Sequence, residues 1–176
     1  MNSTVLALRT AAVVSLFAVA ACDKPKPRDV AAAPEAPPAA TAAPPAAPLP
    51  ALPAWASDYV GKPFTTAFAA GRAKCLGNTD SVMDRFGTEG VRVVGWGWDP
   101  AKKAAVSRVI LVDRDAVVVG AGESGMARPD VTAADGAITD PNTGWSALTS
   151  KTAGPVDAYG LVGDGKTLCP LGHLEF

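Results

Sequence analysis

Residues 91–100 read VRVVGWGWDP. Valine and tryptophan are enriched in β-strands and Asp99-Pro100 is a typical turn pair, so the stretch predicts a strand over Val91–Trp98 that ends in a turn. Side chains alternate across a strand, which places Trp96 and Trp98 on the same face. Because two indoles carry much apolar area, we expect at least one of them in the core.

More segments of this kind follow, separated by turn signals. They are Ser107–Asp113, Ala116–Gly120, Gly144–Thr149, Pro155–Val162 and Lys166–Leu171. Arg114-Asp115 and Gly163-Asp164-Gly165 are the expected hairpin turns. Short strands with frequent turns and no intervening helical pattern predict a mainly β domain, a β-sandwich or alternatively a small β-barrel.

Two other segments interrupt the strand pattern. Asp58–Ala73 carries aromatic residues at roughly helical spacing and predicts a short helix or an irregular lead-in. Gly120–Gly125 is glycine-rich but lacks the Lys-Ser/Thr ending of a phosphate-binding loop, so we expect a mobile hairpin or loop there.

Four of these segments also carry a family resemblance. Residues 95–100 (GWGWDP) are followed by Ile110–Asp113, then by Arg128-Pro129-Asp130-Val131, and then by Gly144-Trp145. The series resembles a small immunoglobulin-like sandwich module of bacterial proteins, over about Leu76–Val162. The resemblance implies a single immunoglobulin-like β-sandwich without established catalysis, of a kind that occurs beside glycosyltransferases and in envelope proteins.

The aromatic residues are also candidates for ligand binding. If the indoles of Trp96 and Trp98 are exposed instead of buried, they form a platform with Trp145 and Tyr159 that could stack on sugar rings. Core packing and an exposed platform are therefore the two interpretations that the sequence leaves open.

Arg128-Pro129-Asp130 is the second candidate binding element. The tripeptide predicts a turn in which Asp130 caps backbone donors and Arg128 pairs with a carboxylate, for which Asp99 and Asp113 are the expected partners. Such an ion pair would fix the geometry of the loop.

The sequence offers little for catalysis or metal binding. Asp99, Asp113 and Asp130 would be the general acid and base of a carboxylate-dependent hydrolase, but acidic residues are common at the turns of a β-sandwich. His173 is the only histidine, lies close to a chain end that we expect to fray, and has no Gly-x-Ser-x-Gly elbow as a partner. No Cys-x-x-Cys or His-x-x-x-His pair suggests zinc, so we predict no catalytic residue, no metal and no cofactor.

The amino-terminal residues have the pattern of an export signal. A sparse positive region ends at Arg9, an apolar run covers Ala11–Phe17, and Val19-Ala20-Ala21-Cys22 resembles the lipobox of bacterial lipoproteins. The resemblance implies cleavage before Cys22 and acylation of both its sulfur and its new amino group, a nearly permanent anchor. The alternative is an ordinary secreted protein cut near Ala21. Asp23 resembles the signal for retention in the inner membrane, although the outer membrane is possible.

These patterns divide the chain into a signal peptide (1–21), a lipidated cysteine with an Ala/Pro tether (22–53) and a β-rich domain (54–176). Frequent prolines keep the tether out of helix, and at about 3.1 Å per residue it would reach at most about 90 Å. We expect a disordered, semi-rigid spacer that lets the domain approach the peptidoglycan layer.

Cys75 and Cys169 are the only cysteines predicted to lie within the domain. In an oxidising compartment they are expected to form a disulfide between the first and last strands. The alternative is two separately buried thiols.

The first functional hypothesis is a non-catalytic interaction module of the cell envelope, bound to the bilayer through its acyl chains and contacting an envelope protein or a glycan. A carboxylate-dependent envelope hydrolase is the second hypothesis, and a lipoprotein that holds an envelope assembly together is the third. A net charge of −1 and the lack of a basic patch argue against a nucleic-acid partner.

Overall fold

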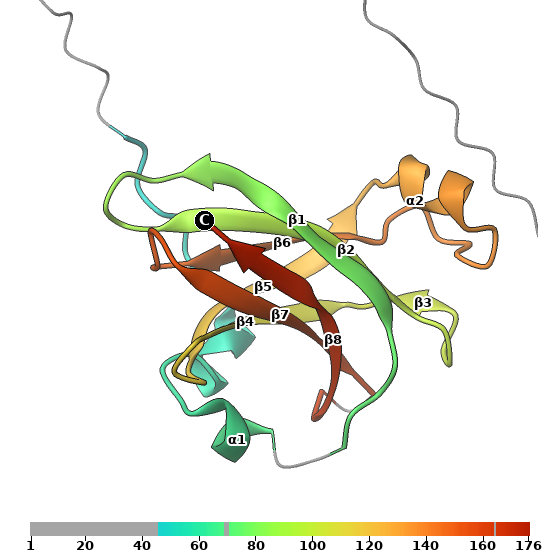
Figure 1. Ribbon diagram of the computed structural model, residues 1–176, viewed down its shortest axis with the longest axis horizontal. Coiled ribbons are helices and arrows are strands. Elements are labelled where there is room, and N and C mark those ends of the chain that lie inside the picture. Colours follow the sequence, from blue (N-terminus) through green and yellow to red (C-terminus); the bar gives the residue numbers. More distant parts are fainter. Residues whose placement is uncertain (1–45, 69–70, 164) are drawn as a thin grey trace, which may run out of the picture. The chain divides into compact units, whose positions relative to one another are not determined.

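The computed structural model describes residues 46–68, 71–163 and 165–176 (Figure 1). The predicted signal peptide, Cys22, Asp23 and most of the tether lie outside the described residues. The elements in chain order are η1 (Ala54–Asp58, a 3-10 helix), α1 (Phe64–Ala67), β1 (Leu76–Arg85), β2 (Val91–Asp99), β3 (Ala104–Ala105), β4 (Arg108–Asp113), β5 (Val118–Met126), α2 (Pro129–Ala134), β6 (Gly144–Thr149), β7 (Pro155–Val162) and β8 (Thr167–Glu175).

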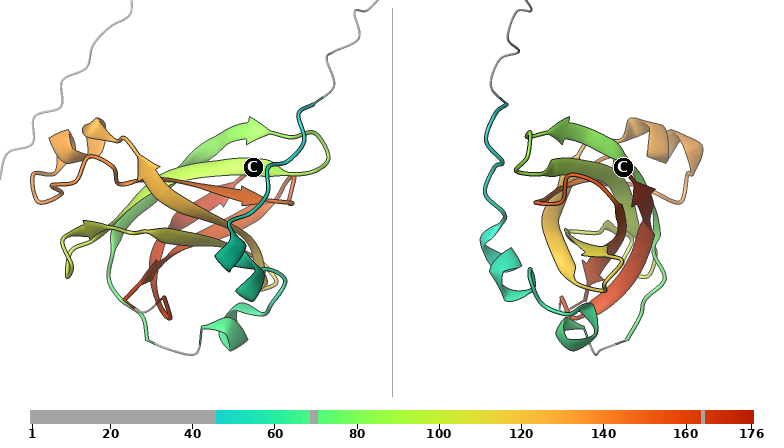
Figure 2. Two further views of the ribbon diagram at one scale, coloured as in Figure 1. Left: turned by 180° about the vertical axis from the view of Figure 1, so that it is seen from behind. Right: turned by 60° about the vertical axis from the view of Figure 1, so that its left-hand side comes forward.

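The strands form one antiparallel sheet in the order β1-β2-β6-β5-β4-β7-β8, with the two-residue β3 paired to β2. The sheet curls until its edge strands β1 and β8 lie side by side, so that it resembles an incompletely closed barrel (Figure 2). The approach is close, because a Cβ atom added at Gly77 on β1 would lie 2.6 Å from Cδ2 of Leu171 on β8. The predicted mainly β class is confirmed.

The main core lies inside the curl. Alternate residues of the strands point inward, among them Val91, Val93, Val109, Leu111 and Trp145, all of them buried. The indole of Trp145 occupies space that only a glycine leaves open on the neighbouring strand, since a Cβ atom at Gly95 would lie 2.4 Å from its Cζ2 atom.

Two short covers bury parts of the outer face. The lead-in through η1 and α1 places aromatic side chains such as Phe68 against Ile110, Val112 and Val118. The short helix predicted within Asp58–Ala73 is confirmed as α1, and η1 precedes it. On another part of the outer face, the connection between β5 and β6 that contains α2 covers Trp98.

Three expectations about local structure are wrong. Gly120–Gly125, expected to be a loop, belongs to β5, because its small residues let β6 approach; a Cβ atom at Gly122 would lie 1.9 Å from the carbonyl oxygen of Ser146. The expected turn at Arg128–Asp130 opens helix α2, with Pro129 in its first turn, where a missing N–H costs nothing. The chain end does not fray, because β8 pairs with β7 as far as Glu175.

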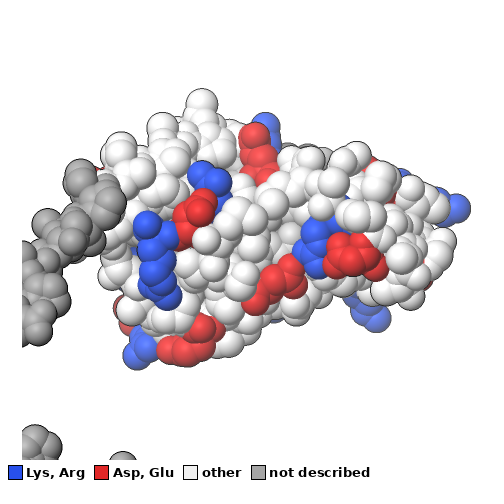
Figure 3. Space-filling model, turned by 90° about the horizontal axis from the view of Figure 1, so that it is seen from above, with Lys and Arg blue, Asp and Glu red and all other residues white. Residues whose placement is uncertain are grey.

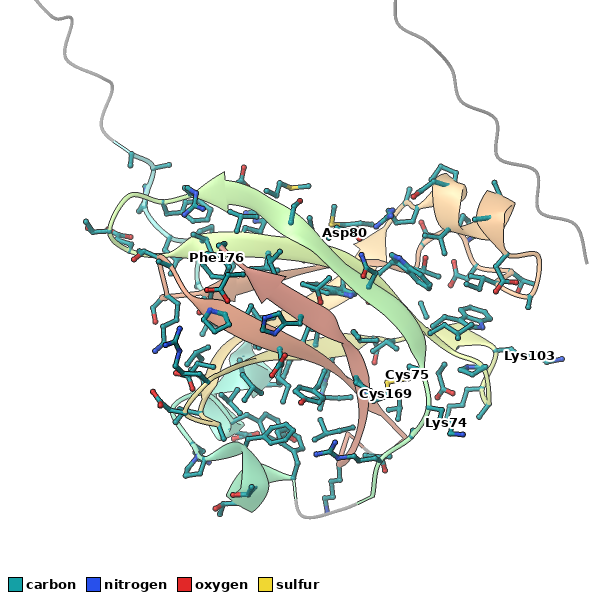
Figure 4. The ribbon with its side chains drawn as sticks, viewed as in Figure 1. Lys74, Cys75, Asp80, Lys103, Cys169 and Phe176 are labelled. Atoms are coloured by element: carbon teal, nitrogen blue, oxygen red, sulfur yellow. A yellow bond between two sulfur atoms is a disulfide. The ribbon has the colours of Figure 1, made fainter. Side chains whose placement is uncertain are left out.

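The predicted disulfide between Cys75 and Cys169 is confirmed. The two Cα atoms are 5.5 Å apart, and the bond joins residues separated by 94 positions. It lies where the chain enters β1, beside β8 (Figure 4). The bond therefore ties the two edges of the sheet together.

The last residues of the predicted tether contact the domain. The N–H of Leu49 donates a hydrogen bond of 2.7 Å to Glu89 Oε2, and Ala46 approaches the neighbouring Gly87. Both partners lie in the turn between β1 and β2. The described chain thus begins at the end of the sheet where this turn lies.

Candidate functional site

A cavity of about 210 Å³ lies between β2 and the α2 connection. Strand β2 contributes Trp96, the segment after β5 contributes Arg128, and α2 with the turn after it contributes Asp130, Val131, Ala134, Asp135 and Ile138. Three predicted binding residues, Trp96, Arg128 and Asp130, therefore meet at one place.

The position of the two indoles follows from the alternation of β2. Trp96 and Trp98 share one face of the strand, as the sequence predicted, and this face is the outer face of the sheet. Trp98 is 1% exposed beneath Val131 and Ile138, which confirms that at least one indole enters a core. Trp96, two residues nearer the middle of the strand, is only half-buried and forms one side of the cavity.

Arg128 is held rigidly at the edge of the cavity. Its Nε and Nη2 atoms donate hydrogen bonds of 2.9 and 2.8 Å to the two carboxylate oxygens of Asp130, and Nη1 donates one of 2.5 Å to Asp80 Oδ2 on β1. Asp80 in turn accepts a hydrogen bond of 2.7 Å from Asn78 Nδ2. A bidentate guanidinium–carboxylate pair fixes orientation as well as position. The prediction that Asp99 or Asp113 is the ion-pair partner of Arg128 is wrong.

The ion pairs keep this site charged. The hydrogen bond to Asp130, and after it the one to Asp80, raises the pKa of Arg128 above its ordinary value. The hydrogen bonds from Arg128 likewise lower the pKa of Asp130. Both groups therefore remain ionised at neutral pH, and Asp130 is a poor proton donor there.

The predicted four-residue aromatic platform does not form. Trp98 and Trp145 are buried in different places, one under α2 and one inside the curl. Tyr159 lies on β7, where its ring packs on Phe64 of α1 with the ring centroids 4.7 Å apart. A strand pattern reveals that a side chain faces outward, but not that another segment covers it. Trp96 alone of the four aromatic residues lines the cavity.

The three aspartates of the hydrolase hypothesis lie apart. Asp99 Oδ1 accepts the N–H groups of Ala101 and Lys102 in the turn after β2. Asp113 belongs to the β4–β5 turn, where Lys151 binds it at 2.8 Å. The register of the strands puts this turn at the opposite end of the sheet from Asp99. The three carboxylates are therefore not brought together in one cleft.

The ionisation of Asp113 fits a structural role. Partial burial raises the pKa of its carboxyl, but hydrogen bonds from Lys151 and from the backbone of Val117 outweigh that effect and lower the pKa overall. A general acid at neutral pH would need a raised pKa.

His173 lies on β8, outside the cavity. Its Nδ1 atom is 2.8 Å from Asp157 Oδ1 on the paired strand β7, and both side chains are exposed.

Among the described residues no group of His, Cys, Asp and Glu side chains is arranged to hold a metal ion. No helix in this part of the chain is long and apolar enough to cross a membrane.

Sequence reasoning missed Asp80, Asp135 and Ile138. Asp80 precedes Arg128 by 48 residues, and no local signal links the two. Asp135 and Ile138 belong to the end of the α2 connection, beyond the predicted turn at Arg128–Asp130. The pair Val131 and Ile138, apolar residues within an otherwise polar connection, was the available sign that this segment covers something.

The surface around these elements is mixed in charge. In the face seen from above, lysine and arginine side chains are interspersed with aspartate and glutamate, and neither sign forms a broad patch (Figure 3).

A comparison with protein-family models, curated proteins and solved structures gives no match for this chain. The case for a function therefore rests on the geometry of the site.

Proposed function

We propose that this protein is a lipid-anchored lipoprotein of the bacterial cell envelope, whose domain is a non-catalytic interaction module that binds its partner in the Trp96 cavity. The observation that carries the proposal is the convergence of Trp96, Arg128 and Asp130 on one cavity. A half-buried indole beside a rigidly held guanidinium is typical of recognition sites, in which aromatic residues and arginine are enriched.

The position of the cavity supports this role. The described chain begins at the β1–β2 turn, and β2 leads from there to the cavity. Trp96 lies five residues beyond Val91 on this strand, a distance of roughly 16 Å along the sheet. The cavity therefore lies away from the point where the described chain begins.

The alternative of a carboxylate-dependent hydrolase has less support. It requires two carboxylates that converge on a substrate, one of them with a raised pKa. Asp99, Asp113 and Asp130 instead bind backbone N–H groups or a neighbouring cation, each at its own place.

The anchor makes the first testable prediction. Replacing Cys22 by serine removes the thiol that the lipobox resemblance assigns to acylation, so we expect a slower-migrating, unprocessed precursor in place of the mature lipoprotein. Electrophoresis and metabolic labelling with a fatty acid measure both effects. Normal processing and membrane retention of the Cys22→Ser protein would contradict the lipoprotein assignment.

The membrane itself is a second part of the proposal. Asp23 favours the periplasmic face of the inner membrane. Density separation of inner and outer membranes locates the wild-type protein, and Asp23→Ser is the matched variant that should move toward the outer membrane if Asp23 acts as the retention signal.

The interaction site is tested by photo-crosslinking in cells that make the full, lipidated chain. A photoreactive amino acid at Ala134, exposed at the cavity, should give a discrete product, which mass spectrometry identifies and which Trp96→Ala removes. Ala153 is the matched control because it is exposed in the β6–β7 connection, at the end of the sheet that also holds the β1–β2 turn. The same products from both positions, or none from Ala134, would refute a binding role for the cavity.

A further inference from the structure

We propose that the Trp96 cavity binds an uncharged sugar ring of a glycan. The inference rests on the proposed function, because it assigns a ligand class to the same cavity. Three properties of the cavity carry it: an aromatic wall above an apolar floor, neighbouring hydrogen-bond donors and acceptors, and a negative net charge.

The walls fit a ring that has one apolar face. Val131 and Ile138 are buried and form an apolar floor, and the half-buried indole of Trp96 stands beside them. A sugar ring exposes C–H groups on one face and hydroxyl groups around its edge. Its C–H face would pack against the indole, which offers a large, rigid surface at low entropic cost.

The polar rim contains donors and acceptors next to each other. Arg128 uses one N–H on each of Nη1 and Nη2 for Asp80 and Asp130, which leaves the second N–H of each atom for a ligand. Asp135 Oδ1 accepts the N–H of Ala137, and its other oxygen accepts none from the described chain. The indole N–H of Trp96 likewise has no partner among the described residues.

A hydroxyl group both donates and accepts hydrogen bonds, so it matches such a rim better than a group that does only one of these. A sugar hydroxyl beside the Arg128–Asp130 pair could accept from a remaining N–H of the guanidinium and donate to a carboxylate oxygen. Because ion pairs already hold both protein groups in position, little side-chain freedom is lost when the ligand binds.

The charge of the site selects against anions. Arg128 is matched by Asp80 and Asp130, and Asp135 adds another carboxylate, so the four groups sum to −2. A phosphate, an acidic lipid headgroup or a uronic acid would be repelled. An uncharged ring fits the site without this penalty, and a cationic ligand is the alternative that the experiment must distinguish.

The test uses the full chain in detergent micelles and isothermal titration calorimetry. The probes are uncharged oligosaccharides of glucose and of N-acetylglucosamine, with 1,5-diaminopentane as the cationic probe and polygalacturonate as the anionic one. We expect one or both uncharged oligosaccharides to bind with a dissociation constant of about 0.1–1 mM, which is typical of a small ligand in one shallow cavity.

Variants of two tryptophans identify the site, and added salt identifies the class of ligand. Trp96→Ala should weaken oligosaccharide binding by at least about 10-fold, while Trp55→Phe, which alters the half-buried tryptophan of the lead-in, should leave it unchanged. Salt dependence identifies the class of ligand, because binding of an uncharged sugar should change little with added salt, whereas binding of a cation would weaken. Circular dichroism confirms that each variant is folded, and Trp96→Phe, which keeps an aromatic ring, should retain part of the affinity.

The outcomes separate this inference from the proposed function. No oligosaccharide binding, or binding that Trp96→Ala leaves unchanged, overturns the sugar assignment, as does binding of the diamine alone. If crosslinking at Ala134 still depends on Trp96 in that case, the cavity is an interaction site for another class of partner. If the crosslink at Ala134 is also missing, the proposed function is refuted as well.

Discussion

Replacing Trp98 by alanine is expected to lower the free energy of unfolding by about 3–5 kcal/mol, the range for removing a large aromatic side chain from a packed core. The indole is 1% exposed and forms one buried cluster with Val131 and Ile138 of the α2 connection. Its loss leaves a cavity beneath α2 and exposes the outer face of β2. Urea denaturation followed by far-UV circular dichroism measures the change.

Trp96→Ala is the matched control, because it removes the same side chain from the same strand and face. The indole is only half-buried, so we expect a loss of about 1–2 kcal/mol. Trp98→Phe should recover part of the stability lost in Trp98→Ala. Equal losses for Trp96→Ala and Trp98→Ala would contradict the packing described here, since the two rings would then be equally covered.

This contrast shows how far the sequence of β2 can be read. Alternation places Trp96 and Trp98 on one face, and that prediction is correct. It cannot say which of them is covered, because the cover comes from the β5–β6 connection, more than thirty residues further along the chain. In a curled sheet the outer face is buried wherever another segment crosses it, so outward-facing and exposed are different properties.

The glycines of β5 led to a wrong prediction for a related reason. Residues 120–125 look like a flexible loop, yet residues 120–123 are paired on both sides within the sheet. Gly122 is required there by the close approach of Ser146, not by a turn. A close approach between strands depends on their register, which a single sequence does not reveal.

The polar part of the site was half predictable. The sequence indicates both Arg128 and Asp130 as binding candidates, and a guanidinium needs carboxylate partners. It assigns Asp130 to the capping of backbone donors, however, and not to Arg128. Asp99 and Asp113, the partners expected for Arg128, instead bind within their own turns. Asp80 became the actual second partner because β1 lies beside β2, and β1 is a polar strand with only one buried side chain, Thr79, among its ten residues. Without the strand order, several aspartates are equally plausible partners.

Removing the disulfide is expected to have an effect as large as that of Trp98→Ala. A bond that closes a loop of 94 residues stabilises a fold by about 4–5 kcal/mol in the chain-entropy model, and native strain reduces the gain. The bond matters more than its loop length suggests, because β1 and β8 are each hydrogen-bonded to one neighbour only within the described sheet. Near the bond, the N–H of Ala73 donates to the carbonyl oxygen of Leu168, and the N–H of Leu168 donates to the carbonyl oxygen of Gly71.

We therefore expect the free energy of unfolding of the Cys75→Ala/Cys169→Ala protein to fall by about 4 kcal/mol or more. The contact between β1 and β8 should also open more readily than the other strand pairs. Hydrogen exchange of the amides of β1 and β8 measures this local opening, with the amides of β4, protected by neighbours on both sides, as the internal reference. Wild-type protein treated with a reductant should match the double variant, and a thiol count on the denatured, unreduced chain should find neither cysteine reactive. If the double variant melts with the wild type, side-chain packing between β1 and β8 is sufficient to hold the curl closed, and the disulfide is not what joins the two edges.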